Sequence, residues 1–198
     1  MKKPITSLLS GLTLIACSTL AQAGGHLNWT LDSEASAVSF GSVKVDVVGE
    51  VNHFESIAGS ISEQGDVNVE IDVASVQTNI DIRNERILEW VLNGAPTATL
   101  EAQIDMAMVN ALAAGDTTLM DVAGTLGVNG VSLDVSASFF VAKLSDSKLL
   151  VTTADMIMLS VDAAGLTAGV DKLMELAGLP SITRVSPVTL RMVFELSA

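Results

Sequence analysis

Cysteine, histidine and tyrosine are scarce in this sequence. The chain of 198 residues contains one cysteine, two histidines and no tyrosine. A single cysteine cannot close an intramolecular disulfide, and so few sulfur and imidazole groups cannot build the usual zinc sites. We therefore expect no metal in the folded domain. Its stability must come from a hydrophobic core, which a content of 49% apolar residues can supply.

Sequence motifs of catalysis are also missing. The chain contains no Gly-x-Ser-x-Gly, no His-Glu-x-x-His, no phosphate-binding loop and no dinucleotide fingerprint. His53 and Glu55 would share one face of a strand, but a catalytic zinc normally needs three protein ligands. We predict a non-enzymatic protein without a cofactor or a catalytic residue. In it His53 is a structural or ligand-contacting polar group.

Basic residues are few compared with acidic ones. Ten lysines and arginines stand against 23 aspartates and glutamates, which gives a net charge of −13. A surface of this charge repels nucleic acid and anionic lipid headgroups. We expect no nucleic-acid partner, and the simplest role of the charge is to keep the protein soluble.

The N-terminal residues have the pattern of a secretory signal peptide. A positive start, "MKK", precedes the apolar stretch "ITSLLSGLTLIA" and the small-residue site "AQA". This predicts a signal peptide at residues 1–23, export, and one mature domain at residues 24–198. The stretch "LIAC" also resembles a lipoprotein box, which leaves a lipid anchor at Cys17 as the alternative. No later run reaches the roughly 18 apolar residues of a membrane span.

Alternation of apolar and polar residues dominates the rest of the chain. Strand patterns cover residues 37–51, 66–76, 99–108, 119–128, 131–144, 148–162 and 187–196. The first pattern would place Val43, Val45 and Val47 on one face, and Asn129-Gly130 is a strong hairpin signal. Seven or eight antiparallel strands with polar outer faces suit a barrel or a sandwich.

Two segments have helical spacing. "NERILEWVLNG" follows a strand that we expect to end at Ile82, and Asn84 is a good N-cap residue. This helix should bury its apolar stripe across one end of the sheet. The second segment, "LTAGVDKLMELAGLP", ends at Gly178 and Pro180. Residues 108–116 are a weaker candidate for a third helical turn.

The alternating valines must face either a filled core or a cavity. Eight strands can close around side chains alone or around one small ligand. The chain offers only five phenylalanines and two tryptophans to fill that space, together with adaptable methionines. Arg83 is expected either in a surface ion pair, for example with Glu85, or at the mouth of a cavity. Trp90 is expected either in the core or against a ligand.

Four motifs, in order, resemble a known family. They are "WTLDSEASAVSF", "GEVNHFESIAGSI", "VEIDVASVQTNIDIRNERI" and "VAGTLGVNGVSLDV". Together they resemble the YceI-like, polyisoprenoid-binding domain over nearly all of Leu27 to Ser197. There are departures: Asn84 stands where many members have aspartate, and Ile87-Leu88 replaces a common His-Leu. A histidine that is often found near Val43 to Val47 is also absent.

The resemblance implies an all-β fold, a lipocalin-like antiparallel barrel of about eight strands, here with two short helices. It also implies an exported, periplasmic bacterial protein whose tubular cavity holds a long-chain isoprenoid, a quinone or a similar amphiphilic lipid. The alternative is a filled-core barrel that acts as a periplasmic interaction or stress-response protein without a lipid. A homodimer is a further expectation. The predicted ligand-binding residues are Phe40, His53, Val69, Ile71, Arg83, Trp90, Phe139, Met192 and Phe194.

Overall fold

The structure is a computed structural model that describes residues 28–197. The predicted signal peptide, residues 1–23, lies outside the described residues, as do Cys17 and the expected cleavage site before Gly24. Within residues 28–197, no helix is long and apolar enough to cross a membrane.

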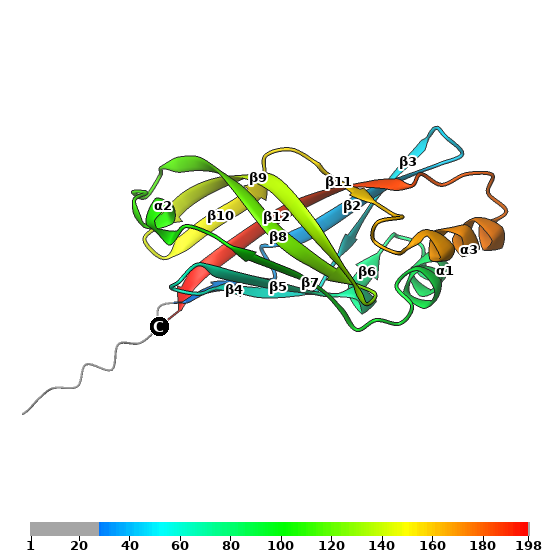
Figure 1. Cartoon of the computed structure of the whole chain (residues 1–198), viewed down its shortest axis with the longest axis horizontal. Coiled ribbons are helices and arrows are strands. Elements are labelled where there is room, and N and C mark those ends of the chain that lie inside the picture. The colour runs from blue at the N-terminus through cyan, green and yellow to red at the C-terminus, as the bar shows by residue number, and fades with distance from the viewer. Residues whose placement is uncertain (1–27, 198) are drawn as a thin grey trace, which may run out of the picture.

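Strands make up most of the described chain (Figure 1). Their bounds are β1 Asn28–Leu31, β2 Ala37–Lys44, β3 Val48–Phe54, β4 Ile57–Ile61, β5 Asp66–Asp72, β6 Val76–Gln77, β7 Thr97–Gln103, β8 Thr117–Val128, β9 Val131–Ser145, β10 Lys148–Thr153, β11 Ile157–Ser160 and β12 Val185–Ser197. The helices are α1 Asp81–Arg86, α2 Met106–Asn110 and α3 Thr167–Ala177, with short turns η1 Val73–Ser75 and η2 Ile87–Val91.

The labelled strands form a single antiparallel barrel with eight wall strands. Four of these wall strands are interrupted and carry two labels each. β1 and β2 follow one edge of β12, β10 and β11 follow its other edge, and β3–β4 and β5–β6 are interrupted in the same way. The ring closes where β1 pairs with β12, with Trp29 opposite Leu196. The predicted eight-stranded barrel is confirmed, and it carries three short helices rather than two.

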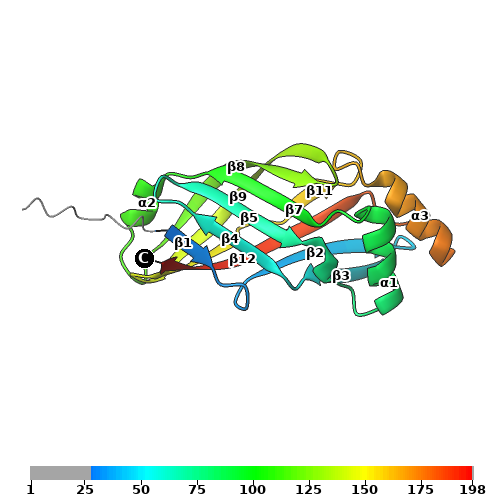
Figure 2. The same ribbon diagram turned by 90° about the horizontal axis from the view of Figure 1, so that it is seen from below.

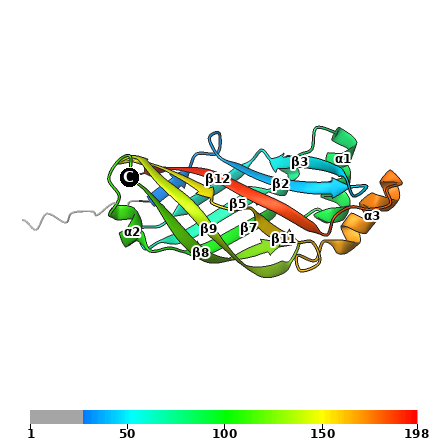
Figure 3. The same ribbon diagram turned by 90° about the horizontal axis from the view of Figure 1, so that it is seen from above.

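The two ends of the barrel differ in their strand pairing. Helix α2 lies at one end, and α1 and α3 lie together at the other (Figures 1, 2 and 3). Toward the α1/α3 end, β9 pairs with β10 only from Phe139 onward, so its first half has β8 as its only neighbour among the described strands. In the same region β6 pairs with β3 and not with β7. The wall is therefore less continuous near α1 and α3.

The sequence predicts one of two tight hairpins and misses the other. Asn129 and Gly130, at φ 52° and 77°, join β8 to β9 as the sequence predicts. The expected run over residues 37–51 is instead broken by a turn at Val45 and Asp46, whose φ angles are 53° and 61°. The prediction that Val43, Val45 and Val47 lie on one face of a single strand is therefore wrong. This unfavourable valine conformation is held by Ser181, whose carbonyl accepts from the Val45 amide (3.1 Å) and whose hydroxyl donates to Asp46 (2.6 Å).

The predicted first helix is present, but its start differs from the expectation. The strand ends at Gln77 rather than Ile82, and α1 begins at Asp81. Asn84 lies inside α1, so its expected role as N-cap is wrong. Its Oδ1 instead accepts hydrogen bonds from the amide (2.9 Å) and hydroxyl (2.5 Å) of Thr78. The chain continues as a wider π-helical turn, with the Leu92 amide bonded to the Ile87 carbonyl.

Candidate ligand-binding cavity

The interior of the barrel is not filled. A cavity of about 440 Å³ extends from the middle of the barrel to the α1/α3 end. This volume lies in the range typical of small-molecule sites, about 300–1,000 Å³. Its walls are mostly apolar side chains from the strands, α1, η2 and α3. They include Val38, Phe40, Ile71, Ile87, Val91, Leu92, Leu126, Val128, Leu159, Val161, Leu166, Leu173 and Val188.

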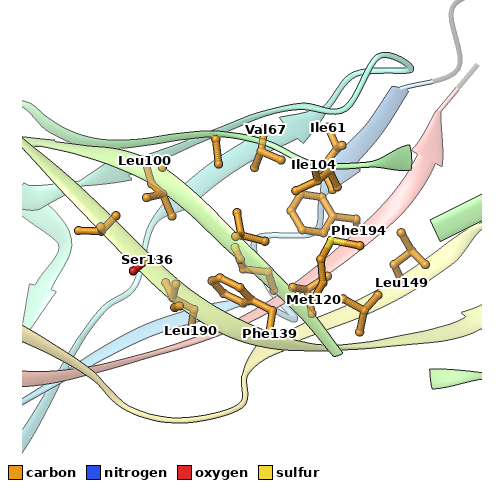
Figure 4. Close-up of a pocket in the computed structure, with 18 of the residues that line it drawn as sticks. Ile61, Val67, Leu100, Ile104, Met120, Ser136, Phe139, Leu149, Leu190 and Phe194 are labelled. Atoms are coloured by element: carbon orange, nitrogen blue, oxygen red, sulfur yellow. The ribbon is translucent and has the colours of Figure 1, made fainter. Parts of the chain in front are cut away.

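A second, smaller cavity of about 80 Å³ lies deeper in the barrel. Figure 4 shows its labelled side chains, from Ile61 and Val67 to Phe139 and Phe194, gathered around one space. Ser136 is the one hydroxyl residue that lines it. Leu100, Val135, Ile157 and Leu190 border both cavities. The two spaces therefore adjoin and together follow the length of the barrel.

Charged side chains gather where the large cavity meets the helices. Glu50 of β3 accepts hydrogen bonds from Lys44 of β2 (2.8 Å) and from Nη1 of Arg83 on α1 (2.6 Å). Arg83 therefore pairs with Glu50, and the expected pairing with Glu85 is wrong. Burial alone raises the pKa of the Glu50 carboxyl, but the two cationic partners outweigh it and hold that pKa below its ordinary value.

Arg83 is held in place by a network on the segment before α1. Its Nη2 donates to the carbonyl of Thr78 at 2.6 Å. Thr78 is 2% exposed and is in turn bonded to Asn84, whose amide also donates to Gln77 at 3.2 Å. Asn84 therefore has a role inside α1. It holds Thr78 in place, and the carbonyl of Thr78 in turn orients the guanidinium of Arg83.

Among residues 28–197, two buried side-chain polar atoms have no hydrogen-bond partner. They are Oδ1 of Asn52 and Nε of Arg83, and both residues line the large cavity. Asn52 is only 3% exposed. Buried polar groups are nearly always hydrogen-bonded, so two such atoms in residues that line the same cavity require an explanation.

The predicted site residues divide into four groups. Phe40, Ile71 and Arg83 line the large cavity, and Phe139, Met192 and Phe194 line the small one. Val69 is fully buried in the core, beyond the walls of both cavities. His53 and Trp90 lie outside. Contact of any of these residues with a ligand stays a prediction.

The positions of His53 and Trp90 follow from strand and helix geometry. On β3, Glu50, Asn52 and Phe54 line the cavity, so His53 points to the opposite face, where its Nε2 is 4.0 Å from Glu55. Trp90 is 42% exposed, with Lys172 of α3 above its ring at 5.6 Å. Sequence reasoning missed Glu50 and Asn52, although the alternation that leads to Phe54 could have identified them.

An eight-stranded antiparallel barrel around an elongated apolar cavity defines a lipocalin-like binding protein. The chain belongs to the YceI-like domain family, whose profile matches residues 29–175. This match agrees with the resemblance of the four sequence motifs. No curated protein sequence matches the chain.

Two solved structures are similar to the described fold. The first is a polyisoprenoid binding domain from Saccharophagus degradans, described as implicated in plant cell wall breakdown. It is 32% identical with a TM-score of 0.84, over 86% of this chain and 99% of that one. The second is BcnA from Burkholderia cenocepacia, 19% identical with a TM-score of 0.63, over 82% and 98% of the two chains. The second likeness concerns the fold alone.

Proposed function

We propose that the protein is an exported bacterial carrier that holds a long-chain isoprenoid or a similar amphiphilic lipid inside the barrel and catalyses no reaction. The observation that carries this proposal is the pair of adjoining, mostly apolar cavities, with charged groups only in the lining of the larger one. The similarity to a polyisoprenoid binding domain at 32% identity supports the same class of ligand.

The energetics of burial favour such a ligand. Each buried methylene group contributes about 0.8 kcal/mol, so a few isoprene units supply ample affinity. The wall strand β12 has 13 residues, and a strand rises about 3.3 Å per residue. A chain lying along this wall would therefore be sheltered over several isoprene units. Periplasmic location, by cleavage before Gly24 or by lipidation of Cys17, is part of the proposal, and the intact mass of the exported form tests it.

A filled-core interaction protein is the other reading of the sequence. It requires a packed interior, and a cavity of about 440 Å³ counts against it. Homodimer formation stays a prediction. The outer edge of β3, residues 48–52, has no strand partner among the described residues and could take part in it.

Substitution of the cavity wall tests the carrier proposal. Ile71→Glu places an unpaired carboxylate in an apolar lining, where the charge is costly. We expect loss of bound lipid, measured by extraction of the purified protein, or loss of folding. Ser60→Glu introduces the same charge on the exposed face of the neighbouring strand β4 and serves as the control. Full lipid content in a folded Ile71→Glu protein would contradict the proposal.

A further inference from the structure

Strand β3 has an unusual distribution of side chains near the cavity mouth. Glu50 and Asn52 face the cavity, whereas Val51 between them is 76% exposed on the outside. An ordinary barrel strand would place the valine inside and the polar groups outside. The arrangement puts an uncharged amide on an otherwise largely apolar wall.

The side-chain amide of Asn52 makes no hydrogen bond to any of the described residues. No hydrogen bond to either of its side-chain atoms is found, and its Oδ1 is fully buried. Burial of an amide without a partner costs free energy. Asn52 lines the large cavity, so a ligand there that brings a hydrogen-bond donor can satisfy this acceptor.

Arg83 offers the complementary group. Its Nη1 is bonded to Glu50 and its Nη2 to the carbonyl of Thr78, which leaves Nε without a partner. Each terminal nitrogen keeps one further N–H, but the charge of the guanidinium is already paired with Glu50. Glu50 pairs with both Arg83 and Lys44, so an anionic headgroup beside them would meet a carboxylate. The buried Nε–H, which has no partner, can be satisfied by a single oxygen atom.

Resting on the proposed carrier function, we propose that Asn52 and Arg83 form a headgroup subsite for an uncharged hydroxyl, as in a prenyl alcohol. The hydroxyl donates to Oδ1 of Asn52, and its oxygen lies where the Nε–H of Arg83 can donate. A quinone or an ether would supply only the acceptor. A phosphate at neutral pH would add negative charge beside Glu50 and supply no donor to Asn52.

Four ligands with the same chain separate these contributions. Farnesol, farnesyl methyl ether, farnesene and farnesyl phosphate are compared by displacement of a fluorescent lipid from the purified, delipidated protein. We expect farnesol to bind about tenfold more tightly than farnesene, the gain from one or two hydrogen bonds. The ether should fall between them, and the phosphate should bind no better than the ether. Equal affinities for farnesol and farnesene, or tightest binding of the phosphate or the ether, would overturn the subsite.

The substitution Asn52→Leu then assigns the donor contact. It should remove the difference between farnesol and the ether, leave farnesene binding intact, and maintain or raise the melting temperature of the empty protein. Asn68→Leu, the same change on the exposed side of β5, should alter none of these values. Retention of the farnesol preference in Asn52→Leu would contradict the assignment. If Asn52→Leu does not fold, the ligand series on the wild-type protein still decides. Failure of all four ligands to bind would instead refute the carrier function itself.

Discussion

The two ends of the barrel differ in how tightly their interiors are packed. At the α2 end β8 before Gly124 pairs with β9 alone, but the other wall strands remain paired, and Phe194, Leu149 and Val69 are at most 1% exposed. At the α1/α3 end some strand edges are unpaired, helices replace part of the wall, and the interior holds the larger cavity. One end thus supplies packing that stabilises the fold, whereas the other keeps an open interior, which we propose holds the ligand.

The largest expected effect is the difference in stability loss when Phe194 or Phe40 is replaced by alanine. Phe194→Ala at the packed end should lower the free energy of unfolding by about 3–5 kcal/mol. Phe40→Ala at the large cavity should cost less than about 3 kcal/mol, because Phe40 already borders empty space and mainly loses its contact with Phe54. Urea denaturation of the delipidated proteins measures both values. Equal losses would remove the distinction between the two ends.

The close approach of helix α3 to the turn η2 provides the second test. A Cβ atom on Gly169 of α3 would lie 2.3 Å from the carbonyl oxygen of Trp90 and 2.5 Å from Cα of Val91. Gly169→Ala should therefore separate α3 from η2, destabilise the protein by about 1–3 kcal/mol, and speed release of a fluorescent lipid.

Gly49→Ala is the matched control for this change, because nothing lies within 4 Å of its added Cβ. It should leave the rate of release unchanged. If Gly169→Ala releases the lipid as slowly as the wild-type protein does, the contact between α3 and η2 does not close the cavity.

The smallest expected effect concerns the charge cluster. The folded state lowers the pKa of Glu50, so this group binds protons less readily in the folded than in the unfolded chain. Its contribution to stability is present above the ordinary value of 4.5 and disappears as the pH falls through the lowered value. Glu50→Gln should cost about 1 kcal/mol or less at pH 7, with a smaller cost near pH 3. If the stability difference between Glu50→Gln and the wild-type protein does not change with pH, this prediction is contradicted.

The same comparison explains which features the sequence could predict. Alternation along β5, β9 and β12 and the Asn129-Gly130 turn are local signals, and they identify the barrel and the residues lining its small cavity. The turn at Val45 depends on Ser181, which is distant in the sequence. The pairing of Arg83 with Glu50 likewise depends on how α1 folds onto β3. At this end local propensity points elsewhere, to an N-cap at Asn84 and an ion pair with Glu85.

Native mass spectrometry of the exported protein tests the central claim most directly. We predict a species that is heavier than the polypeptide by the mass of one lipid. Organic extraction should remove this mass, and incubation with a prenyl lipid should restore one equivalent. A protein that shows only the polypeptide mass, both as purified and after incubation with prenyl lipids, would contradict the account of the cavity as a lipid-binding site.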